Sequence, residues 1–187
     1  MEFLKENSEK RLVCKLRDGS HAAMQEFYAQ YGGRLTALCS SYIADDDDLK
    51  DVMQEAMITI FVRVSDFEYR GKGSLLAWAS RVVINEALKF LRQRKKEGWI
   101  SQEDDIPDIA DDDPNTDGIP PEVLHDMIRH LPDGYRMVFN LYVIEDMSHE
   151  EIAQKLGIKR DTSASQLHRA KKMLARMIKE YLKRQSR

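Results

Sequence analysis

Apolar residues recur at spacings of three and four along most of this chain, and that period is typical of amphipathic α-helices. Stripes of this kind run through residues 21–44, 49–64, 75–96, 149–156 and 167–181. No segment shows a convincing alternation of apolar and polar residues, which would mark a half-buried strand. The pattern therefore predicts an all-α protein.

Two adjacent glycines interrupt the first of these stripes. Gly32 and Gly33 lie in the middle of residues 21–44. Because glycine disfavours helix interiors and often marks a break, we expect the segment to divide there into two helices.

Residues 148–181 have the pattern of a helix-turn-helix. Ser148 and Glu151 form a capping box that starts a helix at His149, and Gly157 suits the left-handed turn that ends it. In this motif the second helix enters the DNA major groove, where cations contact phosphates and polar side chains read base edges. A helical hairpin with a solvated basic face would show the same pattern. The candidate contacts are Arg160, Thr162, Ser163, Ser165, Gln166, His168, Arg169 and Lys172.

The net charge of −3 hides a strong segregation of charge along the 187 residues. Residues 101–119 carry eight acidic and no basic side chains, whereas residues 154–187 carry eleven basic and two acidic ones. The acidic block is also rich in proline and cannot bury enough apolar surface to fold alone. We therefore expect a domain at 1–96, a flexible acidic linker at 97–120 and a second domain at 121–187.

An acidic helix face is predicted near the middle of the first domain. The helix at residues 45–64 begins with four aspartates, which suit the positive end of a helix dipole. Its apolar stripe leaves Asp48, Asp51, Gln54 and Glu55 on or beside the opposite face.

The loop at residues 67–74 and the helix after it interleave aromatic and basic side chains. Single-stranded nucleic acid needs such a surface, because cations track phosphates and rings stack on unpaired bases at roughly 1–3 kcal/mol each. The alternative is that Trp78 and Phe90 are core residues and that the basic residues form a solvated helix end. The candidate contacts are Phe67, Tyr69, Arg70, Lys72, Trp78, Arg81, Lys89 and Arg92.

Disulfide-rich and membrane classes are not expected. The cysteines, Cys14 and Cys39, form no CxxC motif or Cys/His cluster, so neither a disulfide framework nor a structural zinc site is indicated and a reducing cytoplasm fits. No window approaches 18 consecutive apolar residues, and the N-terminus lacks the apolar centre of a secretory signal. We expect a cytoplasmic protein without direct membrane insertion.

An enzyme is a further alternative, because Asp48, Asp51 and Glu55 could hold Mg²⁺ as in all-α nucleotide pyrophosphohydrolases. Such a site needs carboxylates from a second helix, and the remaining acids lie in the proline-rich segment. A nucleophile–base pair and a phosphate loop are not visible either. We expect no catalysis, no metal site and no cofactor.

Several short motifs follow one another in a fixed order over residues 20–180. An Asp-x-x-Gln-Glu helix precedes a Phe, a loop, a Trp, an Asn and a basic helix end, and LPDGYRMVFNLYVIEDMSHEEIAQKLGI precedes Thr-x-x-Ser-x-x-x-Arg-Ala. This series resembles regions 2 and 4 of extracytoplasmic-function (ECF) sigma factors, the small two-domain sigma factors of bacterial RNA polymerase. The matching positions outside the quoted stretch are Asp51, Gln54, Glu55, Phe67, Trp78, Asn85, Leu91, Arg92, Thr162, Ser165, Arg169 and Ala170.

The resemblance implies a function for each predicted surface. The chain would bind the beta and beta-prime subunits of core RNA polymerase through Asp48, Asp51, Gln54 and Glu55, and would direct polymerase to promoter DNA. The loop and helix contacts named above, together with Asn85, would bind the minus-10 element. The helix-turn-helix contacts would bind the minus-35 element. The acidic linker would pass through the polymerase active-site cleft, and an anti-sigma factor would hold the chain inactive. A repressor or activator that binds DNA without polymerase is the alternative.

Some positions depart from the family pattern. Ala164 and Gln166 stand where Lys and Arg are common, Lys89 and Phe90 replace a frequent Asp-His pair, and Ile84 takes a position that is often Arg. These departures bear on the promoter sequence that is read rather than on the fold.

Ser163 departs from the pattern in a way that bears on the recognition helix itself. It stands where an apolar residue usually packs against Ile152 and Leu156. We expect a slight rotation of the recognition helix that moves base readout onto Thr162 or Ser163 itself.

Overall fold

The computed structural model describes residues 2–96, 116 and 118–185. Throughout these ranges the regular structure is helical and contains no strand, so the predicted all-α class is confirmed. The chain separates into two compact units, Met1–Phe90 and Leu91–Arg187, each treated separately below. Most of the predicted linker at 97–120 lies outside the described residues, so its flexibility and its boundaries stay predictions.

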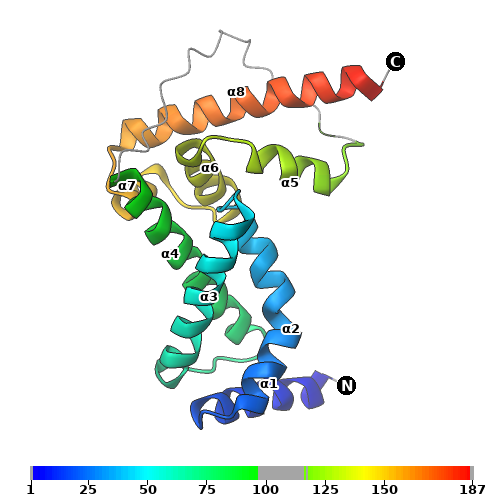
Figure 1. Cartoon of the computed structure of the whole chain (residues 1–187), viewed down its shortest axis with the longest axis vertical. Coiled ribbons are helices and arrows are strands. Elements are labelled where there is room, and N and C mark those ends of the chain that lie inside the picture. The colour runs from blue at the N-terminus through cyan, green and yellow to red at the C-terminus, as the bar shows by residue number, and fades with distance from the viewer. Residues whose placement is uncertain (1, 97–115, 117, 186–187) are drawn as a thin grey trace. The chain divides into compact units, whose positions relative to one another are not determined.

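The first unit is built from three long helices and most of a fourth (Figure 1). Helix α1 spans Glu2–Arg17, α2 spans His21–Ser40, and α3 spans Asp46–Arg63. A short 3-10 turn, η1 (Val64–Asp66), ends α3, and α4 (Ser74–Lys96) follows the loop at 67–74. Helix α1 packs against α2 and η1, and α2 packs against α3.

Side-chain caps fix where two of these helices begin. Ser20 accepts a hydrogen bond from the Ala23 N–H group at the start of α2. The Asp45 carboxylate accepts the N–H groups of Asp47 and Asp48, both at 3.0 Å, at the start of α3. Each cap satisfies backbone donors that have no partner inside the helix.

The expected break at Gly32 and Gly33 is wrong, because α2 runs through both glycines without interruption. A glycine in a helix interior costs only about 1 kcal/mol relative to alanine. Helix α2 buries Phe27, Tyr31 and Leu35, and this packing outweighs the local preference. Gly32 also has a packing role, because a Cβ atom there would lie 3.2 Å from the Tyr28 ring.

The core of the first unit joins α2, α3 and α4. The Phe27 ring packs edge-on against Phe61, with ring centroids 5.7 Å apart. Thr59 of α3 donates a hydrogen bond to the Glu86 carboxylate of α4 at 3.2 Å. The largest fully buried side chains of this unit are Leu12, Leu16, Phe27, Leu35, Tyr42, Ile43, Ile60, Leu75 and Leu88.

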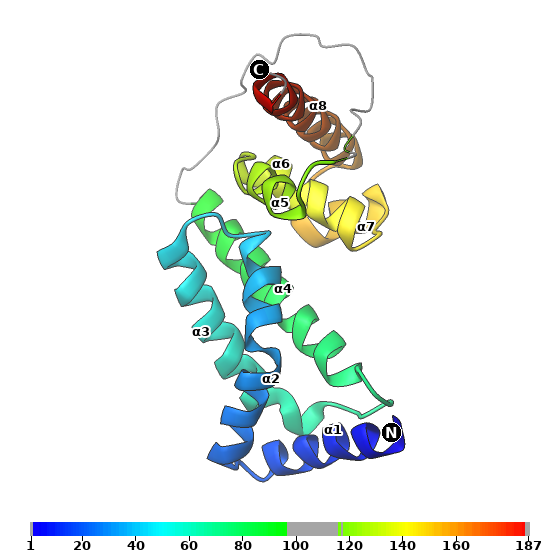
Figure 2. The same cartoon turned by 90° about the vertical axis from the view of Figure 1, so that its right-hand side faces the viewer.

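The second unit holds the predicted helix-turn-helix (Figure 2). Helix α5 (Pro121–Arg129) and α6 (Asp133–Phe139) lead into a π-helical turn, η2 (Asn140–Ile144). Helix α7 (His149–Leu156) and the long helix α8 (Arg160–Gln185) follow. Helices α5, α6 and α7 all pack on α8. A buried cluster of Leu131, Tyr135, Ala170 and Leu174 joins α6 and α8, with residues of α5 packed against it.

A buried arginine joins α5 to α6. The Arg136 guanidinium donates hydrogen bonds to the carbonyl oxygens of Arg129 and Leu131, at 2.8 and 2.6 Å, and to the Asp133 carboxylate. Burial lowers the pKa of Arg136, and the neighbouring Asp133 carboxylate opposes this shift. The arginine therefore satisfies the carbonyls at the end of α5 from inside the unit.

Replacing this arginine should destabilise the second unit selectively. Arg136→Met keeps the apolar stem but leaves buried carbonyls without a donor, so we expect a loss of about 2–4 kcal/mol in unfolding free energy. Hydrogen exchange measured segment by segment should show faster exchange in α5, α6 and α8 but not in α2 or α3. Arg176→Met, at an exposed residue paired with Glu180, is the matched control and should cost under about 0.5 kcal/mol. Equal effects of the two variants would contradict this role of Arg136.

Candidate functional site

The acidic face predicted in the first unit lies on α3. Asp51, Gln54 and Glu55 are exposed, while Asp48 is half-buried in the first turn. The opposite face of α3 is buried and consists of Val52, Met53, Ala56 and Ile60. The structure therefore brings the predicted polymerase-contacting residues together on one accessible side of a helix.

Sequence reasoning missed two apolar residues that continue this face. Ile58 and Val62 are 49% and 70% exposed. They follow Asp51 and Glu55 at helical spacing, so all four side chains lie along one side of α3. The signal was present in the sequence, because both residues fall outside the apolar stripe that the other residues of α3 define. The face is therefore acidic near the helix start and apolar near its end.

The loop at 67–74 has its own internal structure. The Ser74 hydroxyl donates to the Gly71 carbonyl at 2.6 Å and accepts the Arg70 N–H group at 3.3 Å. Gly71 and Gly73 have φ angles of +111° and +87°, which side-chain-bearing residues rarely adopt. Arg70 and Lys72 are exposed, and Tyr69 is half-buried.

Phe67 is buried and so offers little accessible surface for the direct nucleic-acid contact that the sequence predicts. Its ring packs at a tilt against Trp78, with ring centroids 5.1 Å apart. Apolar burial against a neighbouring ring outweighs exposure for a side chain of this kind. Trp78 is half-buried, so part of its indole packs against Phe67 while part stays accessible.

The three basic residues predicted on α4 form a single stripe together with Asn85. Arg81, Asn85, Lys89 and Arg92 are all exposed and follow one another at spacings of four, four and three. Lys89 also pairs with Glu86 at 3.1 Å, at an exposed position. The structure thus places these four residues on one helix face.

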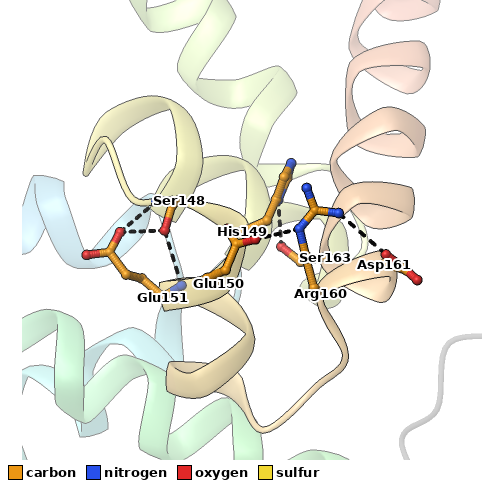
Figure 3. A network of polar contacts seen from close by, with 7 residues as sticks. All are labelled: Ser148, His149, Glu150, Glu151, Arg160, Asp161 and Ser163. Atoms are coloured by element: carbon orange, nitrogen blue, oxygen red, sulfur yellow. Dashed lines mark hydrogen bonds and ion pairs between the residues drawn. The ribbon is translucent and has the colours of Figure 1, made fainter.

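Two polar links join α7 to α8 across the turn at Gly157 (Figure 3). His149 Nδ1 lies 3.0 Å from the Ser163 hydroxyl, and Arg160 Nε donates to the Glu150 carboxylate at 2.6 Å. The second hydrogen bond lowers the pKa of Glu150 and raises that of Arg160. Gly157 has a φ angle of +66°, so the predicted left-handed turn is confirmed.

The predicted start of the first helix of this motif is also confirmed. The Ser148 side chain accepts from the Glu151 N–H group at 3.3 Å, and the Glu151 carboxylate accepts from the Ser148 N–H group at 2.8 Å. The Ser148 N–H group and the Ser148 hydroxyl both donate to the Glu151 carboxylate, and these two bonds lower the pKa of Glu151. The reciprocal bonds complete the capping box and fix the first turn of α7.

Ser163 is 0% exposed and so offers no accessible surface for the base readout that the sequence predicts. Its hydroxyl is turned toward α7 and is satisfied by His149, whose ring stacks on Tyr142 with centroids 4.7 Å apart. A buried hydroxyl needs a hydrogen-bond partner, and His149 supplies one inside the unit. This contact explains how a polar residue can occupy a position where an apolar one was expected.

The remaining predicted residues of α8 differ in how accessible they are. Thr162, Ser165 and His168 are exposed. Gln166 is half-buried and lies over α6, where a Cβ atom at Gly134 would be 3.3 Å from its amide nitrogen.

The cations of α8 differ in the same way. Arg169 is half-buried and donates to the Tyr135 hydroxyl at 3.3 Å. Arg160 is exposed but flanked by the carboxylates of Glu150 and Asp161, at 2.6 and 3.6 Å. Lys172 is half-buried.

Comparison with known proteins assigns both units to one family. Residues 27–97 match the family model described as Sigma-70 region 2, and residues 122–174 match Sigma-70, region 4. The chain belongs to the extracytoplasmic-function sigma factors of the sigma-70 family. It acts in transcription initiation as an RNA polymerase sigma factor.

Curated relatives span most of this sigma factor. The chain is 24% identical over 188 residues to ECF RNA polymerase sigma factor SigW of Bacillus subtilis, covering 91% of the chain and 97% of that protein. It is 28% identical over 180 residues to SigE of Mycolicibacterium smegmatis, covering 90% of the chain but only 66% of that longer protein. A solved structure of the sigma factor RpoE from Bartonella quintana, in complex with the anti-sigma factor NepR, is 20% identical with a TM-score of 0.48, covering 83% of the chain and 96% of that protein.

Membership of the sigma factors bears on the alternative of a polymerase-independent repressor or activator. Such a protein would explain the helix-turn-helix but not the match of residues 27–97 to region 2. The alternative is therefore not favoured.

Among the described helices, none is both long and apolar enough to cross a membrane.

The link between His149 and Ser163 can be measured by a double-mutant cycle in this sigma factor. His149→Phe keeps a ring against Tyr142 but removes the nitrogen, and Ser163→Ala removes the hydroxyl. Each single change leaves one buried polar group without its partner, whereas the double change removes both, so we expect a coupling of about 0.5–1.5 kcal/mol. Hydrogen exchange of α7 and α8 amides gives the free energies. Strictly additive effects would show that the contact contributes nothing to the joining of the two helices.

Proposed function

We propose that the three exposed surfaces described above carry the three binding steps of this sigma factor. The α3 face docks on core RNA polymerase, the loop at 67–74 with α4 holds the opened minus-10 strand, and α8 reads the minus-35 duplex. The observation that carries the proposal is that each set of side chains, predicted from sequence motifs, lies largely together on one helix face.

The α3 face is suited to a polymerase surface that is basic at one end and apolar at the other. Asp51 and Glu55 supply negative charge, which steers a basic partner and weakens with salt. Ile58 and Val62 supply apolar area that a partner would remove from water, at about 25 cal/mol per Å². We therefore include both apolar residues in the proposed docking face, with Asp48 and Gln54 at its edge.

The minus-10 surface combines a cationic stripe with an aromatic edge. Arg81, Lys89 and Arg92 are placed to contact phosphates along α4, while Asn85 offers an amide to a base edge. Trp78 packs against Phe67 and is half-buried, and we propose that the accessible part of its ring stacks on an unpaired base. Tyr69, Arg70 and Lys72 from the loop complete the proposed site.

The minus-35 surface divides into readers near the start of α8 and anchors further along it. Thr162 and Ser165 are exposed in the first two turns, where helix-turn-helix proteins meet base edges. The charge of Arg160 is balanced by Glu150 and Asp161, so phosphate contacts fall to Arg169, Lys172 and the exposed His168. Gln166 is packed over α6, so we expect it to contribute less to the recognition of base pairs than its position in the first two turns of α8 suggests.

Further partners follow from the same proposal. An anti-sigma factor that covered the acidic and apolar face of α3 would exclude polymerase, because one face cannot serve two partners. The acidic linker would occupy the active-site cleft of polymerase. The protein acts in the cytoplasm as a binding factor, without catalysis and without a cofactor of its own.

Charge reversal on α3 tests polymerase docking. Asp51→Lys with Glu55→Lys should weaken binding to core polymerase by at least about tenfold at low salt, and the difference should shrink as salt rises. Glu122→Lys with Glu145→Lys makes the same change in net charge at exposed residues of the second unit. Competition against a labelled sigma factor for core polymerase gives the affinities. If the first variant competes as well as the control, the proposed docking face is wrong.

Readers and anchors on α8 should respond differently to truncation. Ser165→Ala should relax preference at one or two base pairs, by about 1–3 kcal/mol at most. Lys172→Ala should weaken binding equally for all minus-35 sequences and lower the slope of log affinity against log salt by about one. Both are measured as holoenzyme binding to a minus-35 library at two salt concentrations. The same uniform loss for both variants would contradict the division.

A further inference from the structure

Helix α1 lies outside the part of the chain that matches Sigma-70 region 2, which begins at residue 27. It is nevertheless bonded directly to the backbone on both sides of the loop at 67–74. Two side chains, Glu9 and Arg17, make these contacts from positions two turns apart on the helix. The contacts join segments that are about 50 to 66 residues apart in the sequence.

Glu9 holds the end of the loop where α4 begins. Glu9 is only 6% exposed. Its two carboxylate oxygens accept hydrogen bonds from the N–H groups of Gly73 and Leu75, at 2.8 and 2.9 Å. These donors lie at the start of α4, where N–H groups have no partner inside the helix and the dipole favours a negative charge. A carboxylate from a distant helix thus caps α4 in place of a local capping residue.

Arg17 holds the other end of the loop. Its guanidinium donates to the Phe67 carbonyl, and its Nε atom donates to the Val64 carbonyl at 3.4 Å. Val64 begins the η1 turn and Phe67 follows it, so the arginine satisfies carbonyls where the chain leaves α3. A cation suits this position because the C-terminal end of a helix carries partial negative charge.

The Glu9 carboxylate also acts on Tyr31 of α2. Burial, and after it the negative charge of Glu9, raises the pKa of Tyr31 to about 12. Tyr31 therefore keeps its proton at any physiological pH. The Glu9 carboxylate therefore disfavours the ionised form of Tyr31, besides capping the start of α4.

We infer that α1 is a brace for the minus-10 loop, in which Glu9 and Arg17 are positioning residues that order residues 67–74 before DNA arrives. The inference rests on the proposed minus-10 role of this loop. A loop ordered in advance loses less conformational freedom when it captures an unpaired base, so more of the contact energy appears as affinity. A carboxylate and a guanidinium that fix the two ends leave Tyr69, Arg70 and Lys72 in a set geometry between them.

Trypsin reports the order of this loop without any DNA, because Arg70 and Lys72 are cleavage sites within it. Glu9→Gln keeps the shape of the side chain but loses one acceptor and the charge, so cleavage after these two residues should become about tenfold faster. Arg17→Lys keeps the charge, loses one of two carbonyl contacts and should act in the same direction. Asp18→Asn and Arg11→Lys, at exposed positions of α1 and of the turn after it, are matched controls and should cleave like the parent.

A second measurement follows the capture of DNA by holoenzyme. The probe is a fluorescent single-stranded oligonucleotide carrying the non-template minus-10 sequence, with a scrambled oligonucleotide as reference. Glu9→Gln should lower affinity for the specific strand about five- to tenfold, as part of the ordering cost moves to the binding step. Affinity for core polymerase, which depends on the α3 face, should stay unchanged and shows that the first unit is still folded.

Each outcome decides the inference. Unchanged cleavage in both Glu9→Gln and Arg17→Lys would overturn the brace. Faster cleavage with unchanged capture of the specific strand would show that α1 orders the loop without serving promoter opening, which overturns the positioning role. If the parent protein itself does not distinguish the specific from the scrambled strand, the proposed function of the loop is wrong. The trypsin measurement would then still test whether α1 orders the loop. Faster cleavage, together with weaker binding of the specific strand and unchanged polymerase binding, supports the positioning role of α1.

Discussion

Helix ends leave backbone N–H and C=O groups without partners, and the functional surfaces of this chain depend on how those groups are satisfied. Glu9 caps α4 and Arg17 closes the end of η1, so the loop at 67–74 is held between two charged side chains of α1. In the second unit, Ser148 and Glu151 cap α7 reciprocally, and Arg136 binds the last carbonyls of α5. The exposed faces that we propose as partner-binding surfaces are therefore held by polar contacts at the helix ends as well as by apolar packing.

The same contacts divide charged residues into those that hold the fold and those that are offered to a partner. Arg136 and Glu9 are buried and satisfy backbone groups, and losing either leaves several buried atoms without partners. Arg160 is exposed, but its charge is balanced by Glu150 and Asp161. A count of basic residues on α8 thus overstates the positive charge that its first turn presents to DNA. The cationic part of the helix begins at Arg169.

The sequence predicted much of the fold because amphipathic period and caps are local signals. The start of α7 at His149 and the turn at Gly157 follow from residues within one or two turns of each other. The predicted break at Gly32 and Gly33 was wrong because a local preference of about 1 kcal/mol for each glycine is smaller than the packing of α2 against its neighbours. The burial of Phe67 and Ser163 depends on Trp78 and His149, which are eleven and fourteen positions away, so no local pattern could reveal it. Ile58 and Val62 were readable in principle, as apolar residues outside the buried stripe.

The placement of α1 also bears on how promoter opening could be coupled to the rest of the first unit. The loop that would hold the opened strand is joined at one end to η1, which continues α3, and at the other to α4. In our proposal α3 carries the polymerase-docking face and α4 carries the phosphate contacts. Arg17 fixes the end of the loop that follows α3, and Glu9 fixes the end that leads into α4. A rigid link of this kind would let a partner that binds α3 also set the position of the loop, because η1 and its contact with Arg17 would move together with α3. Docking on polymerase and presentation of the minus-10 loop would then be mechanically coupled within one small helical unit.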